Sequence, residues 1–207
     1  MLRRTVDALA EHVRAGGLVV GLEPSCTAVF RSDARELFPH DLDVARLADQ
    51  TRTLAELLVG TEGWEPPHVG GDAVVQPHCH QHAVLGRGPD AELMRRAGID
   101  ATAVSGCCGL AGNFGYEDGH LDVSVRVAEH ELLPAVHGAA EGTDLLADGF
   151  SCRTQVEQLT GRRPRHLAEV LADALPGSDP SLRPRTGRVQ RIRHADLYGT
   201  HDDGWPT

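Results

Sequence analysis

Lysine is absent from this chain of 207 residues, so all 20 basic side chains that carry a permanent charge are arginine. The absence excludes a phosphate-loop lysine and any reaction that forms a Schiff base on lysine. Aromatic residues make up only 4% of the chain, so a hydrophobic core must consist mainly of aliphatic side chains. The formal net charge is −10. Because acidic surfaces repel phosphate groups, we expect no nucleic-acid partner.

Long hydrophobic runs are also missing, and none approaches the ~20 apolar residues that a membrane-spanning helix needs. The first residues form an amphipathic pattern interrupted by acids, unlike the apolar core of a signal peptide. We therefore expect a cytoplasmic protein without an integral membrane segment, which could approach a membrane only peripherally, through a partner. In that compartment, five cysteines indicate metal or redox chemistry rather than a disulfide framework.

Short apolar runs alternate along the chain with segments of helical periodicity. The pattern predicts strands at residues 18–22, 73–76, 101–104 and 144–149. It predicts helices at residues 5–14, 27–38, 41–59, 122–136, 152–159 and 166–175. Strands that alternate with helices imply parallel pairing through right-handed crossovers. We therefore expect an α/β fold, with a parallel sheet covered by helices on its faces.

Composition divides the chain into three parts. A loop rich in glycine and proline at residues 61–71 is the expected boundary between a first unit, 1–60, and a second unit, 61–175. Beyond this second unit, proline, glycine, serine, aspartate and arginine dominate. Such a composition cannot bury enough apolar surface to fold, so we expect residues 176–207 to form a largely disordered tail.

Every cysteine follows a predicted strand and a turn containing glycine or proline, and each is expected to begin a helix. The pattern recurs four times, at Cys26, Cys79, the pair Cys107–Cys108 and Cys152. The carboxyl ends of parallel strands share one edge of a sheet, where ligands bind. Helix N-termini also stabilise thiolates, the form of cysteine that binds metals. We therefore expect all five thiols to share one site at that edge.

A single cysteine after a strand is usually a small buried apolar side chain, but four at the same topological position are hard to explain in that way. The adjacent pair Cys107–Cys108 lies within a glycine-rich loop. We expect Gly106, Gly109 and Gly112 to let the backbone approach a bulky inorganic ligand closely.

The spacing of the cysteines does not decide which metal they bind. The sequence has no CxxC pair, so it contains neither a zinc ribbon nor a closely spaced ferredoxin motif. Thiolates select iron–sulfur clusters or zinc over hard cations. Five sulfurs exceed the four that tetrahedral zinc needs, which favours a cluster. His78, His80 and His82 keep zinc as the alternative, because zinc also accepts mixtures of cysteine and histidine.

Four segments together resemble the cysteine-rich CCG domain: Glu23-Pro24-Ser25-Cys26, His78-Cys79-His80, Cys107–Gly115 and Gly149–Gln155. This domain occurs in the cysteine-rich component of heterodisulfide reductase and in the C-terminal iron–sulfur region of FAD-linked D-2-hydroxyacid dehydrogenases of the D-lactate, D-2-hydroxyglutarate or glycolate type. The likeness covers roughly residues 1–175 and is greatest to the FAD-linked group. It implies that residues 1–60 hold the closing part of a first CCG-type unit plus helices, and residues 61–175 a CCG cysteine-rich unit.

The resemblance implies an iron–sulfur cluster of the [4Fe-4S] type, cubane or noncubane, bound by the CCG cysteines. It also implies electron relay from FAD, held by a partner domain or subunit, to an acceptor. The chain departs from the full pattern because Cys152 is followed by Arg153-Thr154-Gln155, so the usual closing CxxC is missing. The alternative is a zinc-binding structural or interaction module without a redox role. Because we find no FAD-binding domain in the sequence, we expect the isolated chain not to be catalytic alone.

Overall fold

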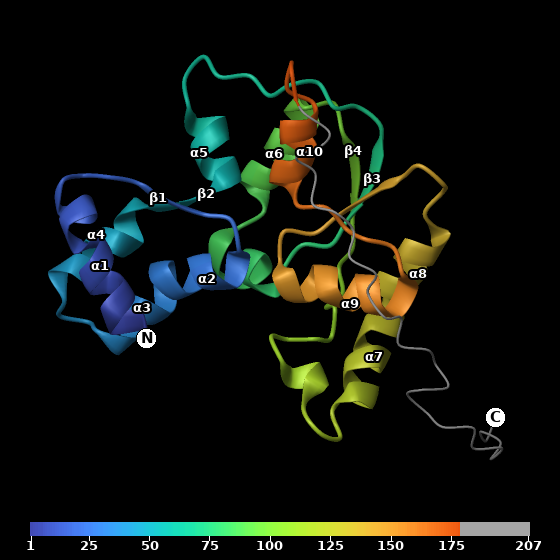
Figure 1. Ribbon diagram of the computed structural model, residues 1–207, viewed down its shortest axis with the longest axis horizontal. Coiled ribbons are helices and arrows are strands. Elements are labelled where there is room, and N and C mark those ends of the chain that lie inside the picture. Colours follow the sequence, from blue (N-terminus) through green and yellow to red (C-terminus); the bar gives the residue numbers. More distant parts are fainter. Residues whose placement is uncertain (179–207) are drawn as a thin grey trace.

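The computed structural model describes residues 1–178 as an α/β fold with two parallel sheets (Figure 1). Strand β1 (Val19–Gly21) pairs with β2 (Thr51–Thr53). The second sheet has the order β4-β3-β5, with the bounds β4 (Asp100–Ala103), β3 (Asp72–Val75) and β5 (Asp144–Leu146). The predicted α/β class and parallel pairing are confirmed. The disordered tail expected from residue 176 lies almost entirely outside the described residues.

Helices cover both faces of the three-stranded sheet, because successive residues of a strand point to opposite sides. Ala73 and Val75 of β3 pack with α5 (Leu54–Gly60), α6 (Gly88–Arg96) and α10 (Leu167–Asp173). Val74, between them, packs instead with α8 (Leu132–Gly138) and α9 (Phe150–Thr160). A buried core therefore lies on each side of β3.

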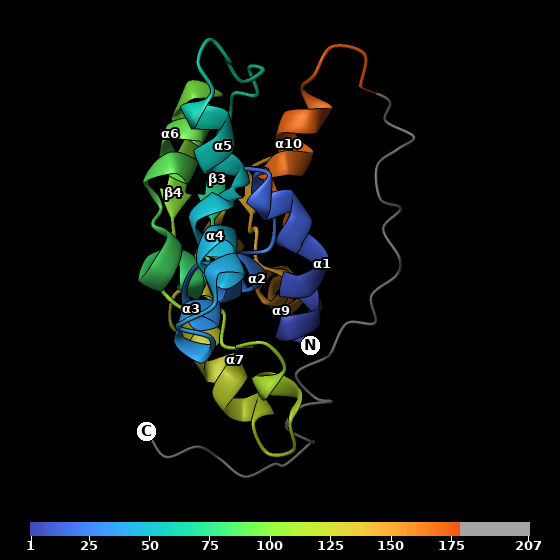
Figure 2. The same ribbon diagram turned by 90° about the vertical axis from the view of Figure 1, so that its left-hand side faces the viewer.

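The first sheet belongs to a smaller lobe formed by the N-terminal elements, at the left of Figure 1. Helix α1 (Leu2–Arg14) packs against α4 (Leu42–Gln50), around a core that includes Val6, Val13 and Leu47. Helix α2 (Pro24–Ala28), the π-helical turn η1 (Val29–Asp33) and α3 (Ala34–Leu37) follow one another along the lobe, with α2 nearest α9 in Figure 1. Figure 2 views the molecule from the side of this lobe. The division into units at residue 60 stays a prediction, and α5, which precedes it, packs into the core of the larger sheet.

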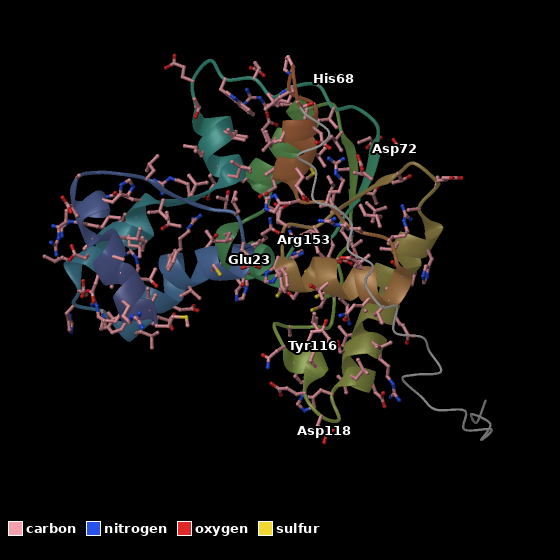
Figure 3. All side chains as sticks on the ribbon, viewed as in Figure 1. Glu23, His68, Asp72, Tyr116, Asp118 and Arg153 are labelled. Carbon is pink, nitrogen blue, oxygen red and sulfur yellow. The ribbon has the colours of Figure 1, made fainter. Side chains whose placement is uncertain are left out.

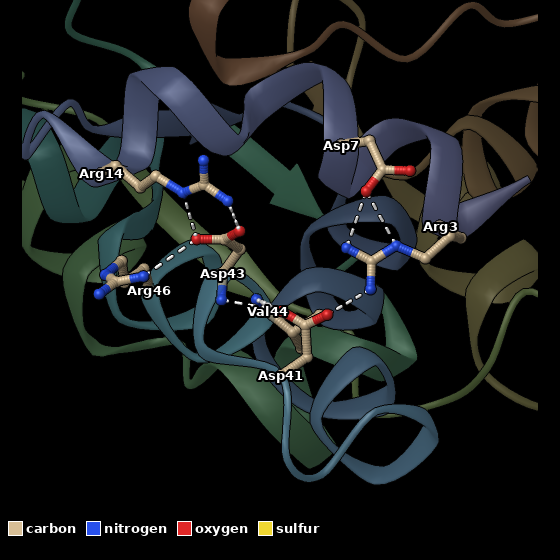
Figure 4. A network of polar contacts seen from close by, with 7 residues as sticks. All are labelled: Arg3, Asp7, Arg14, Asp41, Asp43, Val44 and Arg46. Atoms are coloured by element: carbon tan, nitrogen blue, oxygen red, sulfur yellow. Dashed lines mark hydrogen bonds and ion pairs between the residues drawn. The ribbon is translucent and has the colours of Figure 1, made fainter.

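Arginine–aspartate pairs hold the surface of this lobe together (Figure 4). Arg3 pairs with Asp7 at 2.9 Å and also with Asp41. Arg14 donates from Nε to Asp43 at 2.9 Å, joining α1 to α4. Asp41 also caps α4, because its Oδ1 accepts from the backbone N–H of Asp43 at 2.9 Å. Exposed pairs of this kind stabilise a fold only modestly.

The predicted long helix at 41–59 is wrong, since β2 interrupts it between α4 and α5. Thr53 begins a new helix through a capping box: its hydroxyl accepts from the N–H of Glu56 at 3.1 Å, while the Glu56 carboxylate accepts from the N–H of Thr53 at 2.8 Å. The β-branched side chain of Thr51 favours the extended form, and its hydroxyl donates back to the carbonyl of Leu47 at 2.7 Å.

The helix predicted at 122–136 is also divided, into α7 (Leu121–His130) and α8, with a break at Glu131. Pro134 explains the break, because proline has no N–H to donate and its ring clashes with the carbonyl four residues earlier. The helix start expected after His78 corresponds to a turn at residues 79–80 that continues as the π-helical turn η2 (Gln81–Leu85). Sequence reasoning missed α6 and the short 3-10 turn η3 (Phe114–Tyr116). Within residues 1–178, no helix has both the length and the apolar content to cross a membrane.

Candidate metal centre

Four of the five cysteines line one cavity of about 230 Å³: Cys79, Cys107, Cys108 and Cys152. They lie in three segments that follow β3, β4 and β5, at the carboxyl ends of neighbouring parallel strands. The structure thus brings together thiols that are up to 73 positions apart in sequence. Their assignment as metal ligands stays a prediction.

The segment that carries Cys107 and Cys108 is a loop, so the helix expected to begin there is wrong. Hydrogen bonds shape this loop instead: the N–H of Gly109 donates to Cys107 Sγ at 3.3 Å, and Gln76 Nε2 donates to the carbonyl of Gly106 at 2.9 Å. By contrast, Cys79 opens a helical turn, and Cys152 lies in the first turn of α9.

The three glycines singled out by the sequence have different surroundings. Gly106 lines the cysteine cavity. Gly109 has φ +84°, and a Cβ there would lie 2.0 Å from the backbone oxygen of Ser124 in α7. Close packing of the loop on α7 therefore requires this glycine independently of any ligand. Gly112 has φ +72° and open space around it. A role for the three in admitting a ligand stays a prediction.

Three of the cavity thiols, Cys79, Cys107 and Cys108, have raised pKa values. Cys108 and Cys152 are buried, whereas Cys79 and Cys107 are exposed at the cavity's rim. A hydrogen bond to Cys108, followed by burial, raises the pKa of Cys107 far above its usual range. For Cys108, a hydrogen bond with Cys107 lowers the pKa. A hydrogen bond with Cys152, burial and the charge of Cys152 together outweigh this effect and raise the pKa of Cys108 to about 11. Burial and the neighbouring Cys107 also raise the pKa of Cys79.

His78, Cys79 and His80 offer ligand atoms that all lie within 4.8 Å of one another. The two imidazole rings stack, with centroids 5.1 Å apart. Burial lowers the pKa of His78, which keeps its ring in the neutral form that binds metals. Among the described residues, the buried Nδ1 of His80 has no hydrogen-bond partner. His80 therefore offers a nitrogen without a partner beside Cys79, whereas Nδ1 of His78 accepts from the N–H of His80 at 3.2 Å.

Cys26 is not among the residues that line the cavity. The expectation that all five cysteines follow strands of one sheet is wrong for it, because β1 pairs only with β2 and belongs to the smaller sheet. Glu23 nevertheless connects the segment that carries Cys26 to the segment that carries Cys152. It lies at the junction of α2 and α9 (Figure 3). Its carboxylate accepts from the N–H groups of Cys26 at 2.9 Å and Phe150 at 3.4 Å.

Glu23 thereby links the start of α2 to the start of α9, the helix that carries Cys152. Burial alone would raise the pKa of Glu23, but hydrogen bonds from Ser25, Cys26 and Phe150 lower it overall. Burial, followed by the charge of Glu23, raises the pKa of the Cys26 thiol. Cys26 therefore lies on the flank of the candidate centre, in an environment that favours its protonated form.

Sequence reasoning missed Gln76, which joins two of the cysteine segments. Its side chain is only 4% exposed, and its Nε2 donates to the carbonyls of Pro77 and Gly106 at 3.0 and 2.9 Å. The bond to Gly106 ties the end of β3 to the loop after β4. A polar residue directly after the apolar run 73–75 and before Pro77 was the available signal.

The donor set fits a soft metal ion or an iron–sulfur cluster. Thiolates and neutral imidazoles are the ligands that such metals prefer. Crowded thiols that hold their protons release them when a cation binds, because the cation neutralises the charges that otherwise repel. The four cavity cysteines can supply sulfur ligands. His82, which also lines the cavity, and His78 and His80, which lie beside Cys79, can supply nitrogen.

No protein-family profile matches the chain. D-2-hydroxyglutarate dehydrogenase of Pseudomonas putida is 27% identical over 173 residues, covering 81% of this chain and 16% of that protein. The enzyme of the same name from Escherichia coli is 26% identical over 180 residues, covering 84% of this chain and 17% of that protein. The chain spans about one-sixth of the length of these relatives. The likeness to D-2-hydroxyacid dehydrogenases expected from the motifs is confirmed to this extent, and assignment to the CCG domain stays a prediction.

Proposed function

We propose that the chain is the iron–sulfur electron-transfer module of an FAD-linked 2-hydroxyacid oxidoreductase. The observation that carries this proposal is the convergence of Cys79, Cys107, Cys108 and Cys152 on one cavity. Four sulfur donors at the carboxyl edge of a parallel sheet suit a cluster better than a packing role. The dehydrogenase name shared by the relatives supports the reaction class.

The four cavity cysteines would hold the cluster, with Cys26 on its flank as a further candidate ligand. A bound cluster supplies one-electron transfer, and the chain's own groups tune and protect it. The N–H of Gly109, already directed at Cys107 Sγ, would stabilise negative charge on that sulfur. Burial of Cys108 and Cys152 would exclude water from one side of the site.

Electrons would enter or leave through the exposed side, where Cys107 meets an open groove of about 460 Å³. Val123 and Val127 of α7 line this groove and are 51% and 37% exposed. Apolar side chains beside an exposed ligand suit contact with a redox partner. We assign this surface to the flavin-bearing domain or subunit, on which the 2-hydroxyacid would be oxidised.

Anaerobic purification followed by visible spectroscopy and by iron, sulfide and zinc analysis tests the assignment. A brown chain with iron and acid-labile sulfide is the expected result. Hydroxyacid oxidation with an artificial electron acceptor should appear only after an FAD-containing partner is added. A colourless chain without iron after anaerobic cluster reconstitution contradicts the proposal, as does turnover by the chain alone.

Zinc binding without a redox role is the second candidate, and the grouping of His78, Cys79 and His80 specifically favours it. Mixed cysteine and histidine ligands are typical of structural zinc. Such a module would hold domains together and carry no electrons. The same metal analysis separates the two, since a zinc module would contain stoichiometric zinc and no sulfide.

A further inference from the structure

A second cavity, of about 360 Å³, lies next to the cysteine cavity and shares Gln76 and Pro77 with it. Its wall includes Val75, Ala103 and Leu146, at the ends of β3, β4 and β5. Strand β3 is central, and the chain continues to β4 on one side and to β5 on the other. Open α/β sheets bind ligands in the crevice at such a reversal of strand order.

The wall of this second cavity is largely apolar, and its described lining residues include no cysteine. Met94 of α6 and Leu167 of α10 contribute side chains from the two helices that cover this part of the sheet. A bare metal ion would leave most of this surface without contact. The space instead suits an organic molecule with an apolar body.

The unpaired polar atoms of the cavity are hydrogen-bond acceptors. Both bonds made by the buried Gln76 side chain use its Nε2, and its Oε1 has no partner among the described residues. Asp90 Oδ1 accepts from Gln81 Nε2 at 3.3 Å, while the buried Oδ2 of Asp90 has no partner in this part of the chain. A ligand that satisfies both atoms must therefore donate hydrogen bonds.

The charged side chains in the wall of the cavity determine which sign of charge a ligand can carry. Two carboxylates, Asp90 and Asp148, line the cavity and interact electrostatically. Asp148 is partly engaged, because it lies 3.4 Å from His166 and accepts from the N–H of Leu167 at 2.9 Å. Arg87 also lines the cavity, but its side chain is on the exposed surface. The acidic interior disfavours an anion and favours a cation.

We propose that this second cavity binds a small organic ammonium ion with an apolar body. The ammonium group donates hydrogen bonds to Gln76 Oε1 and Asp90 Oδ2, and the body packs against Met94 and Leu167. A primary ammonium has three donors and a positive charge, which match the unpaired acceptors and the paired acids. The proposed ammonium site does not depend on the identity of the metal, so it can be tested independently of the proposed redox function.

The chain contains its own reporter for this site. It has two methionines: Met94 lies in the cavity wall, whereas Met1 is fully exposed. The full-length chain, with 13C-labelled methionine methyl groups, is titrated with benzylamine at pH 8. At that pH Asp90, whose pKa burial raises to about 7, is ionised, and benzylamine is still an ammonium ion. We expect the Met94 signal to shift and saturate while the Met1 signal stays in place. An unmoved Met94 signal, with no benzylamine retained in equilibrium dialysis, would overturn the proposal.

Two probes of nearly the same shape test the charge on the unmodified chain. Benzyl alcohol, which is neutral, and benzoate, which is an anion, should each bind at least about tenfold more weakly than benzylamine, because a hydrogen bond to a charged group is the stronger one. Equal or tighter binding of either probe would refute the ammonium assignment. Magnesium ions that shift the Met94 signal and compete with benzylamine would refute it in favour of a metal site.

A matched pair of variants locates the ammonium group. Asp90→Asn should weaken benzylamine binding by about tenfold or more, because it removes the buried negative charge but keeps an oxygen at that position. Glu92→Gln makes the same change in charge on the same helix, where Glu92 pairs with Arg95 on the surface, and should leave binding unchanged. Equal effects of the two variants would contradict the assignment. If Asp90→Asn does not fold, the three probes decide the matter on the unmodified chain.

Discussion

Buried polar groups have different hydrogen-bond partners in the two regions of the molecule, the small lobe around β1 and β2 and the larger region around β3, β4 and β5. In the lobe, the buried hydroxyls of Thr27 and Thr51 each donate to a backbone carbonyl, at 2.8 and 2.7 Å. In the larger region, buried polar atoms of Gln76, His80, Asp90 and His120 lack hydrogen-bond partners among the described residues, although His120 Nδ1 lies 3.2 Å from a Glu117 carboxylate oxygen. The lobe has one such atom, in Gln50, far in sequence from any cysteine.

This difference distinguishes buried polar groups that stabilise the fold from buried polar groups that are free to bind a ligand. A buried polar atom without a partner costs free energy, so proteins retain such atoms mainly where a ligand uses them. Those of Gln76, His80 and Asp90 lie beside the two cavities at the carboxyl edge of the larger sheet. We therefore expect substitutions there to change ligand content, and substitutions of Thr27 or Thr51 in the lobe to change stability alone.

The largest effect is expected from Cys108→Ser, at the centre of the cysteine group. Cys108 is 3% exposed, and interactions with Cys107 and Cys152 both influence its pKa. Loss of this ligand should lower metal content by at least about half and the melting temperature by about 5 °C or more, since metal binding stabilises the folded state. Metal analysis and calorimetry of the anaerobically purified variant measure both.

Cys26→Ser sharpens this comparison, because Cys26 lies outside the cavity. A smaller loss of metal than in Cys108→Ser would place Cys26 on the flank, as the geometry indicates. An equal loss would make it a full ligand. Unchanged metal content in Cys108→Ser would reduce Cys108 to a packing role and contradict the proposed centre.

Gly109→Ala should destabilise the larger region by about 2–4 kcal/mol, because it combines a left-handed backbone with a backbone clash. The new Cβ would lie 2.0 Å from the Ser124 oxygen, at φ +84°. Gly112→Ala is the matched control: its φ is +72°, but no atom lies within 4 Å of the added carbon. It should cost only about 1 kcal/mol. Similar urea midpoints for the two variants would contradict the packing role of Gly109.

The sequence predicted the parallel α/β class and the recurrence of cysteines after strands, because both depend on local patterns. Periodicity could not reveal that β1 and β3 belong to different sheets, since strand pairing depends on contacts distant in sequence. For the same reason, the separation of Cys26 from the other four cysteines was not predictable. The joining role of Gln76 likewise arises from a bond to Gly106, 30 residues away.

Asp90→Asn should stabilise the chain at pH 8, in the absence of added amine, by about 1–3 kcal/mol. Burial, followed by the charge of Asp148, raises the pKa of Asp90 from 3.8 to about 7. Between these values, the folded chain holds a proton that the unfolded chain has released. The contribution of Asp90 to stability therefore falls as the pH rises through that window and is constant above it.

Urea unfolding of Asp90→Asn and the unmodified chain at pH 5 and pH 8 measures this effect. The advantage of the variant should be larger at pH 8, because only there does the folded unmodified chain carry the buried charge. An equal advantage of the variant at pH 5 and pH 8 would show that the pKa of Asp90 is not raised in the folded chain.

The smallest effect is expected from Thr53→Ala, where the lobe meets the larger region. The Thr53 hydroxyl accepts from the N–H of Glu56 at the start of α5, and alanine removes this cap. The expected loss is about 1 kcal/mol, measured by urea unfolding. Thr53→Ser keeps the hydroxyl and should lose only a few tenths of a kcal/mol. Because Thr53 does not line the cysteine cavity, both variants should keep the full metal content of the unmodified chain. Loss of metal in Thr53→Ala would instead mean that the start of α5 helps to position the cysteine loops, and the two regions would then be coupled rather than separate.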